Sequence, residues 1–260
     1  MKINYISPIV IGITVFICTT LFACENEDES SKTSYKFTFP SSDPANGLVV
    51  DNAAGTVLWD FTNLTYWGTE SPTVVDKTGY TMQNDTLRFI THKETSERPK
   101  FRTLDKIYAF GKYTWRVYIP MPGVGDCCSV GAFLYSDDHH EIDFEIGYGK
   151  ASVRKSLSAG SSDLVAYLTC QDNPAFQRFS LVKANKWYDL TMDLQNVNGK
   201  YYLSWIINDK VVASVQTEFG SETPFYIFCS LENLSFIGDH LATQDNYCLF
   251  DFVKFQPYNN

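Results

Sequence analysis

The chain has little positive charge, and its basic residues are not clustered. Lysine and arginine together number 21 against 30 acidic residues in a chain of 260, so the formal net charge is -9. Nucleic-acid binding needs a concentrated basic surface that neutralises phosphates. We therefore expect no nucleic-acid partner, and neutral or weakly charged substrates fit the composition better than polyanions.

Histidine and cysteine are scarce as well. There are 4 His and 7 Cys, and none of them shows the spacing of a zinc site. Cys18 lies in the signal segment described below, and Cys24 is the candidate lipidation site described with it. Without these two, an odd number of cysteines remains, so at least one thiol stays free or pairs between chains. We expect most of them to be small core residues, with a vicinal Cys127-Cys128 disulfide as the alternative. These cysteines are Cys127, Cys128, Cys170, Cys229 and Cys248.

Long apolar runs are missing after the N-terminus, so the sequence predicts no later membrane span. Residues 1–23 are predicted to be a signal peptide, with Lys2 followed by the apolar run 9–17. A transmembrane anchor is the alternative, but this run is short and interrupted. The segment Leu21-Phe22-Ala23-Cys24 resembles a bacterial lipobox, which implies a lipid on Cys24 that anchors the protein to a membrane. Residues 24–44 are predicted to be a flexible acidic tether.

The expected location is therefore the bacterial outer membrane. Acidic residues directly after Cys24 resemble the surface-export signal of some lipoproteins, which implies exposure at the cell surface.

Helical periodicity is almost absent, and short alternating segments separated by turn signals take its place. Asn198-Gly199 is a strong hairpin signal. The sequence predicts an all-β fold, a two-sheet antiparallel β-sandwich of jelly-roll type, with an up-and-down barrel as the alternative. Strands are expected at 56–61, 86–91, 108–119, 188–194, 201–207, 211–215, 224–229 and 247–256.

The segment Glu141-Ile142-Asp143-Phe144-Glu145 carries the candidate chemistry. In a strand, side chains alternate between faces, so the three acids share one face and the apolar residues can enter a core. Three carboxylates on one face repel each other, so folding stability alone does not favour the arrangement. Paired carboxyl groups on either side of a sugar linkage are what glycoside hydrolysis requires.

The series of motifs around this segment resembles glycoside hydrolase family 16. The segment 141–145 matches the E-x-D-x-E signature of that family, and the resemblance covers about residues 45–258. The other matching blocks are 110–120, 131–134, 205–210 and 249–256. Two departures exist: Leu134 stands where many members have Trp, and the strand lacks the extra residue that many β-1,3-glucanases insert before the last Glu.

The resemblance implies a concanavalin A-like jelly roll and a retaining, endo-acting hydrolase of β-linked glucans or galactans, working as a monomer on a polysaccharide. It implies that Glu141 is the nucleophile, Glu145 the general acid/base and Asp143 an assisting carboxylate. No cofactor is required, although some members hold a structural calcium near the position of Asp251. Glu141 and Glu145 lie roughly 13 Å apart along an extended backbone. Their long side chains must therefore lean together to approach the roughly 5–5.5 Å that retaining catalysis uses.

Sugar rings stack on exposed aromatic faces, so we expect Trp67, Trp115, Tyr135 and Trp187 to be substrate-binding candidates, with burial in the core as the alternative for each. Arg116 is a further candidate, for hydrogen bonds to sugar hydroxyls, although a surface ion pair fits it equally well. Two rival functions remain open at this point. One is a non-catalytic glycan-binding protein on the same fold, and the other is a structural sandwich whose acids form a solvated face.

Overall fold

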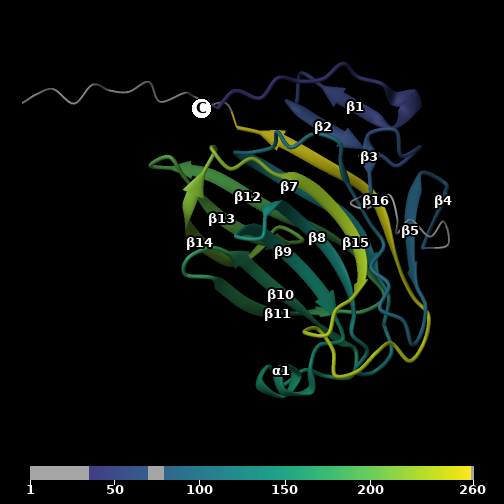
Figure 1. Ribbon diagram of the computed structural model, residues 1–260. Helices are drawn as coiled ribbons and strands as arrows, with labels where there is room; N and C mark the ends of the chain where they lie inside the picture. The colour runs from purple at the N-terminus through teal and green to yellow at the C-terminus, as the bar shows by residue number, and fades with distance from the viewer. Residues whose placement is uncertain (1–34, 70–78, 259–260) are drawn as a thin grey trace, which may run out of the picture. The chain divides into compact units, whose positions relative to one another are not determined.

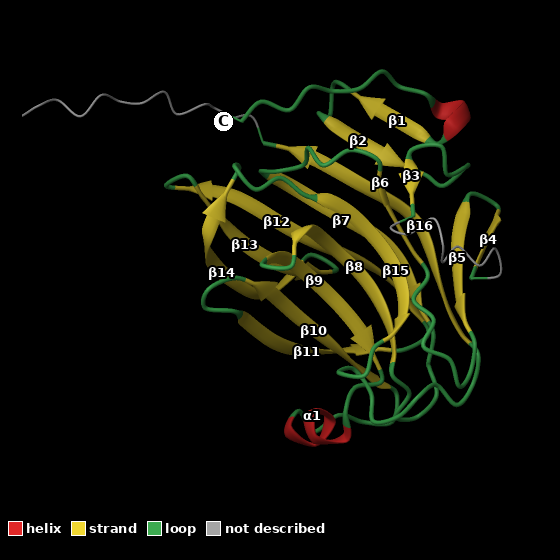
Figure 2. Ribbon diagram, viewed as in Figure 1, coloured by secondary structure: helices red, strands yellow, loops and turns green. Residues whose placement is uncertain are grey.

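Two antiparallel β-sheets pack face to face in the computed structural model, which describes residues 35–69 and 79–258 (Figure 1). Within these residues, helix is confined to the 3-10 turn η1 (Pro44–Asn46) and the short helix α1 (Ala151–Ser156) (Figure 2). The two-sheet sandwich confirms the predicted all-β fold class and excludes the up-and-down barrel.

The first sheet has nine strands within the described residues, in the order β1-β2-β16-β7-β12-β13-β14, with β5 pairing β16 and β4 pairing β5. These strands are β1 (Leu48–Asp51), β2 (Thr56–Trp59), β4 (Tyr80–Gln83), β5 (Thr86–Thr91), β7 (Gly111–Ile119), β12 (Lys186–Val197), β13 (Lys200–Ile207), β14 (Lys210–Gly220) and β16 (Asn246–Pro257).

The second sheet has seven strands within the same residues, in the order β11-β10-β9-β8-β15-β6-β3. These strands are β3 (Trp67–Gly68), β6 (Lys100–Thr103), β8 (Cys128–Asp137), β9 (His140–Gly147), β10 (Asp163–Gln171), β11 (Phe176–Lys183) and β15 (Tyr226–Asn233).

Alternating apolar side chains from both sheets fill the space between them. On β7, every second residue is fully buried, including Tyr113, Trp115 and Val117. On β9, Ile142 and Phe144 face them from the other sheet, as period-two alternation requires. The seven-stranded sheet therefore has one face in the core and a second face that is free to carry a site.

Two tight hairpins of the nine-stranded sheet use residues with positive φ. Asn198 and Gly199 have φ of 56° and 84°, and Asn208 and Asp209 have φ of 45° and 66°. Two-residue turns with both φ angles positive match the right-handed twist of the flanking strands, and Asn, Asp and Gly adopt them at low cost. These turns fix the register of β12, β13 and β14.

The predicted flexible tether 24–44 is wrong for its last part. Tyr35 donates a hydrogen bond from its hydroxyl to the Ile107 carbonyl oxygen at 2.9 Å. The Phe37 ring packs edge-on against Phe255 at 5.1 Å between ring centroids. In this segment, aromatic residues that pack against the core alternate with the exposed Lys36 and Thr38. The segment is therefore a part of the domain. The predicted signal peptide and Cys24 lie outside the described residues.

The cysteines of the domain are buried free thiols, so the alternative of a vicinal Cys127-Cys128 disulfide is wrong. Among residues 35–69 and 79–258, none of the helical segments has the length and apolar character needed to pass through a bilayer.

We expect Phe37→Ala to destabilise the domain by about 1–3 kcal/mol, because it removes a ring that packs against the core. Thr38→Ala is the matched control, since Thr38 is the exposed neighbour of Phe37. The measurement is chemical denaturation of both variants. Equal midpoints for Phe37→Ala and wild type would show that the segment contributes nothing to the domain.

Candidate active site

Strand β9 holds the three acids on the face that points away from the core. It is an interior strand, paired with β8 on one side and β10 on the other. Its position is fixed from the opposite sheet, because the fully buried Trp205 of β13 donates a hydrogen bond from Nε1 to the Asp143 carbonyl oxygen at 3.0 Å. The sequence-predicted alternation of Glu141, Asp143 and Glu145 with core residues is therefore what the structure contains.

The residues beside each acid follow from the strand register. Glu141 lies opposite Tyr135 on β8 and Gln171 on β10. Asp143 lies between Phe133 and Thr169, and Glu145 lies between Gly131 and Tyr167. Hydroxyl and aromatic side chains therefore surround the carboxyl groups, and we call this outward surface of the seven-stranded sheet the acid face.

Asp143 is 5% exposed and accepts a hydrogen bond from the Thr169 hydroxyl. Burial, followed by the charges of Glu141 and Glu145, raises the pKa of Asp143 well above its usual value. A raised pKa of this origin means that the ionised form is disfavoured in the free protein. A protonated Asp143 can donate a hydrogen bond to a neighbouring carboxylate or to a sugar oxygen.

Glu145 is 6% exposed and accepts a hydrogen bond from the Ser129 hydroxyl on β8. Burial, followed by the charge of Glu232, raises the pKa of Glu145 to about 8, while the Ser129 hydrogen bond and Lys100 act in the opposite direction. At neutral pH the carboxyl group therefore carries a proton. That is the state required of a general acid.

Gly131 makes room for Glu145. A Cβ at this position would lie 2.9 Å from Glu145 Oε1 and 2.2 Å from Ser230 Oγ, which is closer than packed atoms tolerate. The matching block 131–134 contains this glycine, and its lack of a side chain leaves room for the Glu145 carboxyl group above β8.

A fourth carboxylate, Glu232, lies on the acid face and was not predicted from the sequence. It is 1% exposed, and its Oε2 contacts Lys100 Nζ at 2.9 Å and Arg98 Nε at 2.5 Å. The sequence signal that could have found it is a single acid within the apolar segment that becomes β15. By strand alternation, this acid falls on the face that points away from the core.

A pocket of about 500 Å³ lies beside Glu232, with Arg98 in its wall. Residues 234–241, which we call the 234–241 loop, form most of the remainder, with Phe236 and His240 among the lining residues. The Phe236 side chain is 48% exposed. The volume lies within the range of small-molecule sites.

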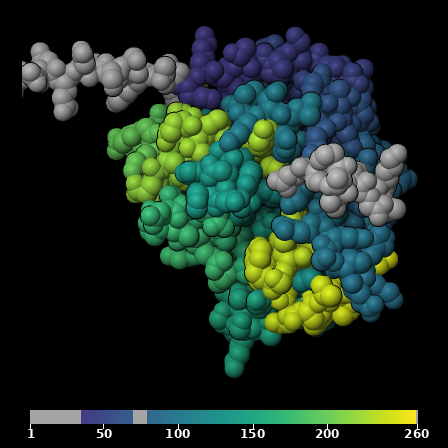
Figure 3. Space-filling model, viewed as in Figure 1, coloured from purple at the N-terminus to yellow at the C-terminus, as the bar shows by residue number. Residues whose placement is uncertain are grey.

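The 234–241 loop lies on the acid face itself. Leu234 and Ile237 pack with Val165 and Tyr167 of β10 in a second apolar cluster, separate from the main core. Asp239 accepts a hydrogen bond from the Ala151 amide at 3.0 Å, which joins the loop to α1. Figure 3 shows α1 in teal beside this late segment in yellow, at the lower end of the view. The pocket therefore lies at the Glu145 end of β9.

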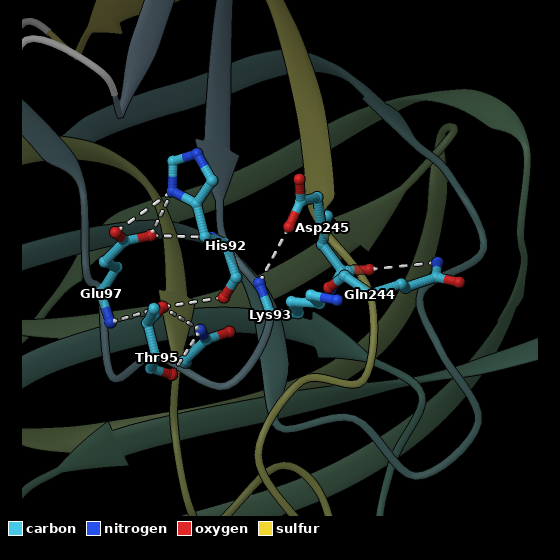
Figure 4. Close-up of polar contacts among 8 residues, drawn as sticks. His92, Lys93, Thr95, Glu97, Gln244 and Asp245 are labelled. Atoms are coloured by element: carbon cyan, nitrogen blue, oxygen red, sulfur yellow. Dashed lines mark hydrogen bonds and ion pairs between the residues drawn. The ribbon is translucent and has the colours of Figure 1, made fainter.

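Ser96 and Arg98 also line the pocket, and the segment 92–98 to which they belong is held by polar contacts (Figure 4). Glu97 accepts a hydrogen bond from the His92 amide at 2.7 Å, and the Lys93 amide donates to Asp245 at 3.0 Å. Asn233 donates from Nδ2 to the Thr95 carbonyl oxygen at 2.9 Å. These contacts fix Arg98 at the boundary between the pocket and the acid face.

Of the predicted substrate-binding residues, two lie in the core. Trp115 is fully buried and donates a hydrogen bond from Nε1 to the Phe228 carbonyl oxygen at 2.9 Å. Trp67 is buried beside Trp59 and Phe61. Neither ring offers a face to a ligand, so the prediction that they bind substrate is wrong and the core alternative holds.

Two further candidates lie on the wrong sheet. Arg116 of β7 and Trp187 of β12 are on the outer face of the nine-stranded sheet, where the guanidinium lies 5.5 Å from the Trp187 ring. Arg116 also contacts Asp189 at 3.1 Å, so it forms the surface ion pair that was the alternative. The alternation of residues along a strand shows which side chains share a face, but it does not show which of the two sheets the strand joins.

Tyr135 lies on the acid face opposite Glu141, and its hydroxyl donates to Asp138 at 2.8 Å. Sequence analysis missed other rings of this face: Phe133 and Phe228 stack at 4.5 Å, and Arg102 lies 4.0 Å from the Tyr226 ring. Asp251 is exposed on β16, and no group of three or more potential metal ligands occurs in the described part of the chain. A structural calcium near Asp251 stays a prediction, because calcium also takes backbone carbonyl oxygens as ligands.

Comparison with solved structures defines the class of fold, a concanavalin A-like jelly roll of the type found in glycoside hydrolase family 16. The Bacillus licheniformis β-glucanase is 15% identical, with a TM-score of 0.56 over 78% of this chain and 99% of that chain. The Crh5 transglycosylase in complex with NAG is 19% identical, with a TM-score of 0.56 over 82% of this chain and 87% of that one.

A third similar structure is the Bacteroides ovatus mixed-linkage glucan GH16 protein in complex with a G4G4G3G product. It is 13% identical, with a TM-score of 0.50 over 76% of this chain and 98% of that chain. No protein-family model and no curated protein matches the sequence. At these identities the likeness establishes the fold, and the chemistry must be argued from the residues of the site.

The raised pKa of Glu145 predicts a pH-dependent stability. The folded protein keeps this proton up to about pH 8, whereas an ordinary glutamate has a pKa of 4.5. Between these values the folded state binds more protons than the unfolded chain, so the free energy of unfolding falls as pH rises. We expect Glu145→Gln, which is neutral at every pH, to reduce this fall by an amount on the order of a few kcal/mol.

The measurement is chemical denaturation of wild type and Glu145→Gln at intervals from pH 5 to pH 9. Asp143 remains in the variant without the neighbouring Glu145 charge that raises its pKa, so the difference between the profiles reports Glu145 together with this coupling. Parallel pH profiles would mean that Glu145 titrates normally in the folded state.

Proposed function

We propose that the protein is a retaining glycoside hydrolase that cleaves internal β-linkages of a polysaccharide of the β-glucan or β-galactan type. The observation that carries the proposal is the set of three carboxyl groups on the acid face of β9, where burial raises the pKa of Glu145 to about 8. A retaining hydrolase needs one protonated and one ionised carboxyl group at the same linkage.

In the proposed reaction, Glu145 donates its proton to the glycosidic oxygen as the bond from that oxygen to the anomeric carbon breaks. Glu141 attacks the anomeric carbon and forms a glycosyl ester, and the leaving sugar departs with the proton. Glu145, now ionised, accepts a proton from water, whose oxygen attacks the anomeric carbon and releases Glu141. Asp143 lies between the two along β9, where its protonated form would donate a hydrogen bond to one of them. The reaction uses carboxyl groups alone and needs no cofactor.

The surroundings of the acids support a polysaccharide as substrate. Aromatic rings of the acid face, such as Tyr135 and Tyr226, suit the apolar faces of sugars. The pocket beside Glu232 extends the surface beyond the scissile linkage, which is the arrangement expected for a chain that continues past the cleavage point. The similar Bacteroides ovatus structure contains a glucan product, which agrees with this substrate class.

The proposal includes a location. A lipid on Cys24 would anchor a monomeric enzyme to the bacterial outer membrane, with the domain exposed to polysaccharide outside the cell. This part rests on the N-terminal sequence, where Leu21-Phe22-Ala23 precedes the cysteine.

We expect Glu141→Gln to lower kcat by several orders of magnitude while the protein still binds its glycan, because the amide keeps the shape but cannot attack the anomeric carbon. The measurement is release of reducing ends from β-glucans, xyloglucan, agars, carrageenan and porphyran, together with glycan binding by calorimetry. Glu218→Gln is the matched control, since Glu218 is an exposed residue of β14 that pairs with Lys200.

A second variant, Glu141→Ala, tests the nucleophile directly. Added azide should restore cleavage and give a glycosyl azide of inverted configuration, because azide attacks from the side that the carboxylate occupied. If wild type binds a polysaccharide but releases no reducing ends from any polymer, the alternative of a non-catalytic glycan-binding protein is correct.

We expect Phe236→Ala to raise KM for a long polymer by about tenfold with little change in kcat, because it removes a half-exposed ring from the pocket but leaves the carboxyl groups in place. Tyr202→Ala, an exposed ring on β13 of the other sheet, is the control. An unchanged KM for polymers of every length would exclude the pocket from substrate binding.

A further inference from the structure

Glu232 is a buried carboxylate that the proposed reaction does not use. Along β15, Glu232 points to the same side as Phe228 and Ser230, so it lies on the acid face. Cys229 and Leu231 point to the other side and belong to the core. In the register of β15 and β8 it lies opposite Ser129, the residue whose hydroxyl donates to Glu145. Glu232 and Glu145 therefore flank the same serine.

Two cations bind the Glu232 carboxylate. Lys100 Nζ and Arg98 Nε both contact its Oε2, at 2.9 Å and 2.5 Å. Charge-assisted hydrogen bonds of this kind offset the cost of burying a carboxylate that is 1% exposed. A fixed negative charge thus lies beside the candidate general acid.

The ion pair between Lys100 and Glu232 also weakens the effect of the Lys100 charge on Glu145. Lys100 lies opposite Ser230 in the register of β6 and β15, and it is the cation that lowers the pKa of Glu145. While its ammonium group is bound to Glu232, much of its field is cancelled by the partner carboxylate. Glu232 therefore acts on Glu145 in two ways, by direct repulsion and by neutralising Lys100.

Other titratable or charged groups lie around Glu145 on every element packed against it. They are Glu141 and Asp143 on β9, Cys128 on β8, Tyr167 on β10, Glu232 on β15, and Lys100 with Arg98 on β6 and the residues before it. Of these carboxylates, Glu232 contacts both Lys100 and Arg98.

We propose that Glu232, held by Lys100 and Arg98 and lying opposite the serine that binds Glu145, is a positioning residue for the candidate general acid and thereby sets the alkaline limit of the hydrolysis proposed above. The inference rests on the proposed function for its consequence in activity, but the proton on Glu145 can be measured without any substrate.

The test is a pH titration of the Glu145 carboxyl carbon by NMR in protein labelled with carbon-13 glutamate, with Glu145→Gln used to assign the signal. We expect Glu232→Gln to lower the titration midpoint of Glu145 by about one unit or more, because a negative neighbour is lost and Lys100 becomes available. Lys100→Met should move the midpoint in the opposite direction. Glu218→Gln, the same substitution at a lysine-paired residue of the other sheet, should leave it unchanged.

Activity is measured in parallel. If the wild type hydrolyses a polysaccharide, the alkaline limb of its kcat/KM profile should move to lower pH in Glu232→Gln by the same amount as the NMR midpoint. A general loss of structure would lower the rate at all pH values without moving the limb.

An unchanged Glu145 midpoint in Glu232→Gln overturns the proposal, even if the protein is an active hydrolase. A midpoint that shifts as expected supports it, even if no polymer is cleaved, in which case only the proposed function fails. Should Glu232→Gln not fold, Lys100→Met decides, because a midpoint that stays in place or falls contradicts the proposal.

Discussion

The burial of one face of β9 against the nine-stranded sheet is the constraint on which the site depends. Phe144 and its apolar neighbours are fixed in the core, and Trp205 reaches across the sandwich to the Asp143 carbonyl oxygen. Because side chains alternate, this packing forces the acids outward together. A shift of one residue in register would place the carboxyl groups in the core, at a cost far above the stability of a typical domain.

The chemistry of the acid face comes from unequal surroundings. Asp143 and Glu145 are nearly buried and are met by hydroxyl groups, whereas the positive charges nearby are bound to Glu232. Lys100 and Arg98 thus lie close to the acid face while they contact Glu232. Hydrolysis of a glycoside requires such an inequality, since identical carboxyl groups could not divide the roles of acid and nucleophile.

Local alternation predicted the strands well, and β5 occupies the expected residues 86–91. It could not predict which sheet a strand joins, so Trp187 was placed in the site although it lies on the opposite face of the sandwich. The acids of β9 were found because they are adjacent in sequence. Glu232 was missed because its partners Lys100 and Arg98 are more than one hundred residues away, and only the pairing of β15 with β6 and β8 brings them together.

The packed aromatic segment at the start of the domain would limit how far the proposed hydrolase could work from a membrane to which it is anchored. If Cys24 carries a lipid, the chain between it and Tyr35, where the domain begins to pack, spans at most about 35–40 Å when fully extended. Such a short linker would confine the acid face of the proposed hydrolase to a thin zone above the lipid headgroups. Long polymers would then be cut where they touch the cell, and their fragments would be released within reach of uptake.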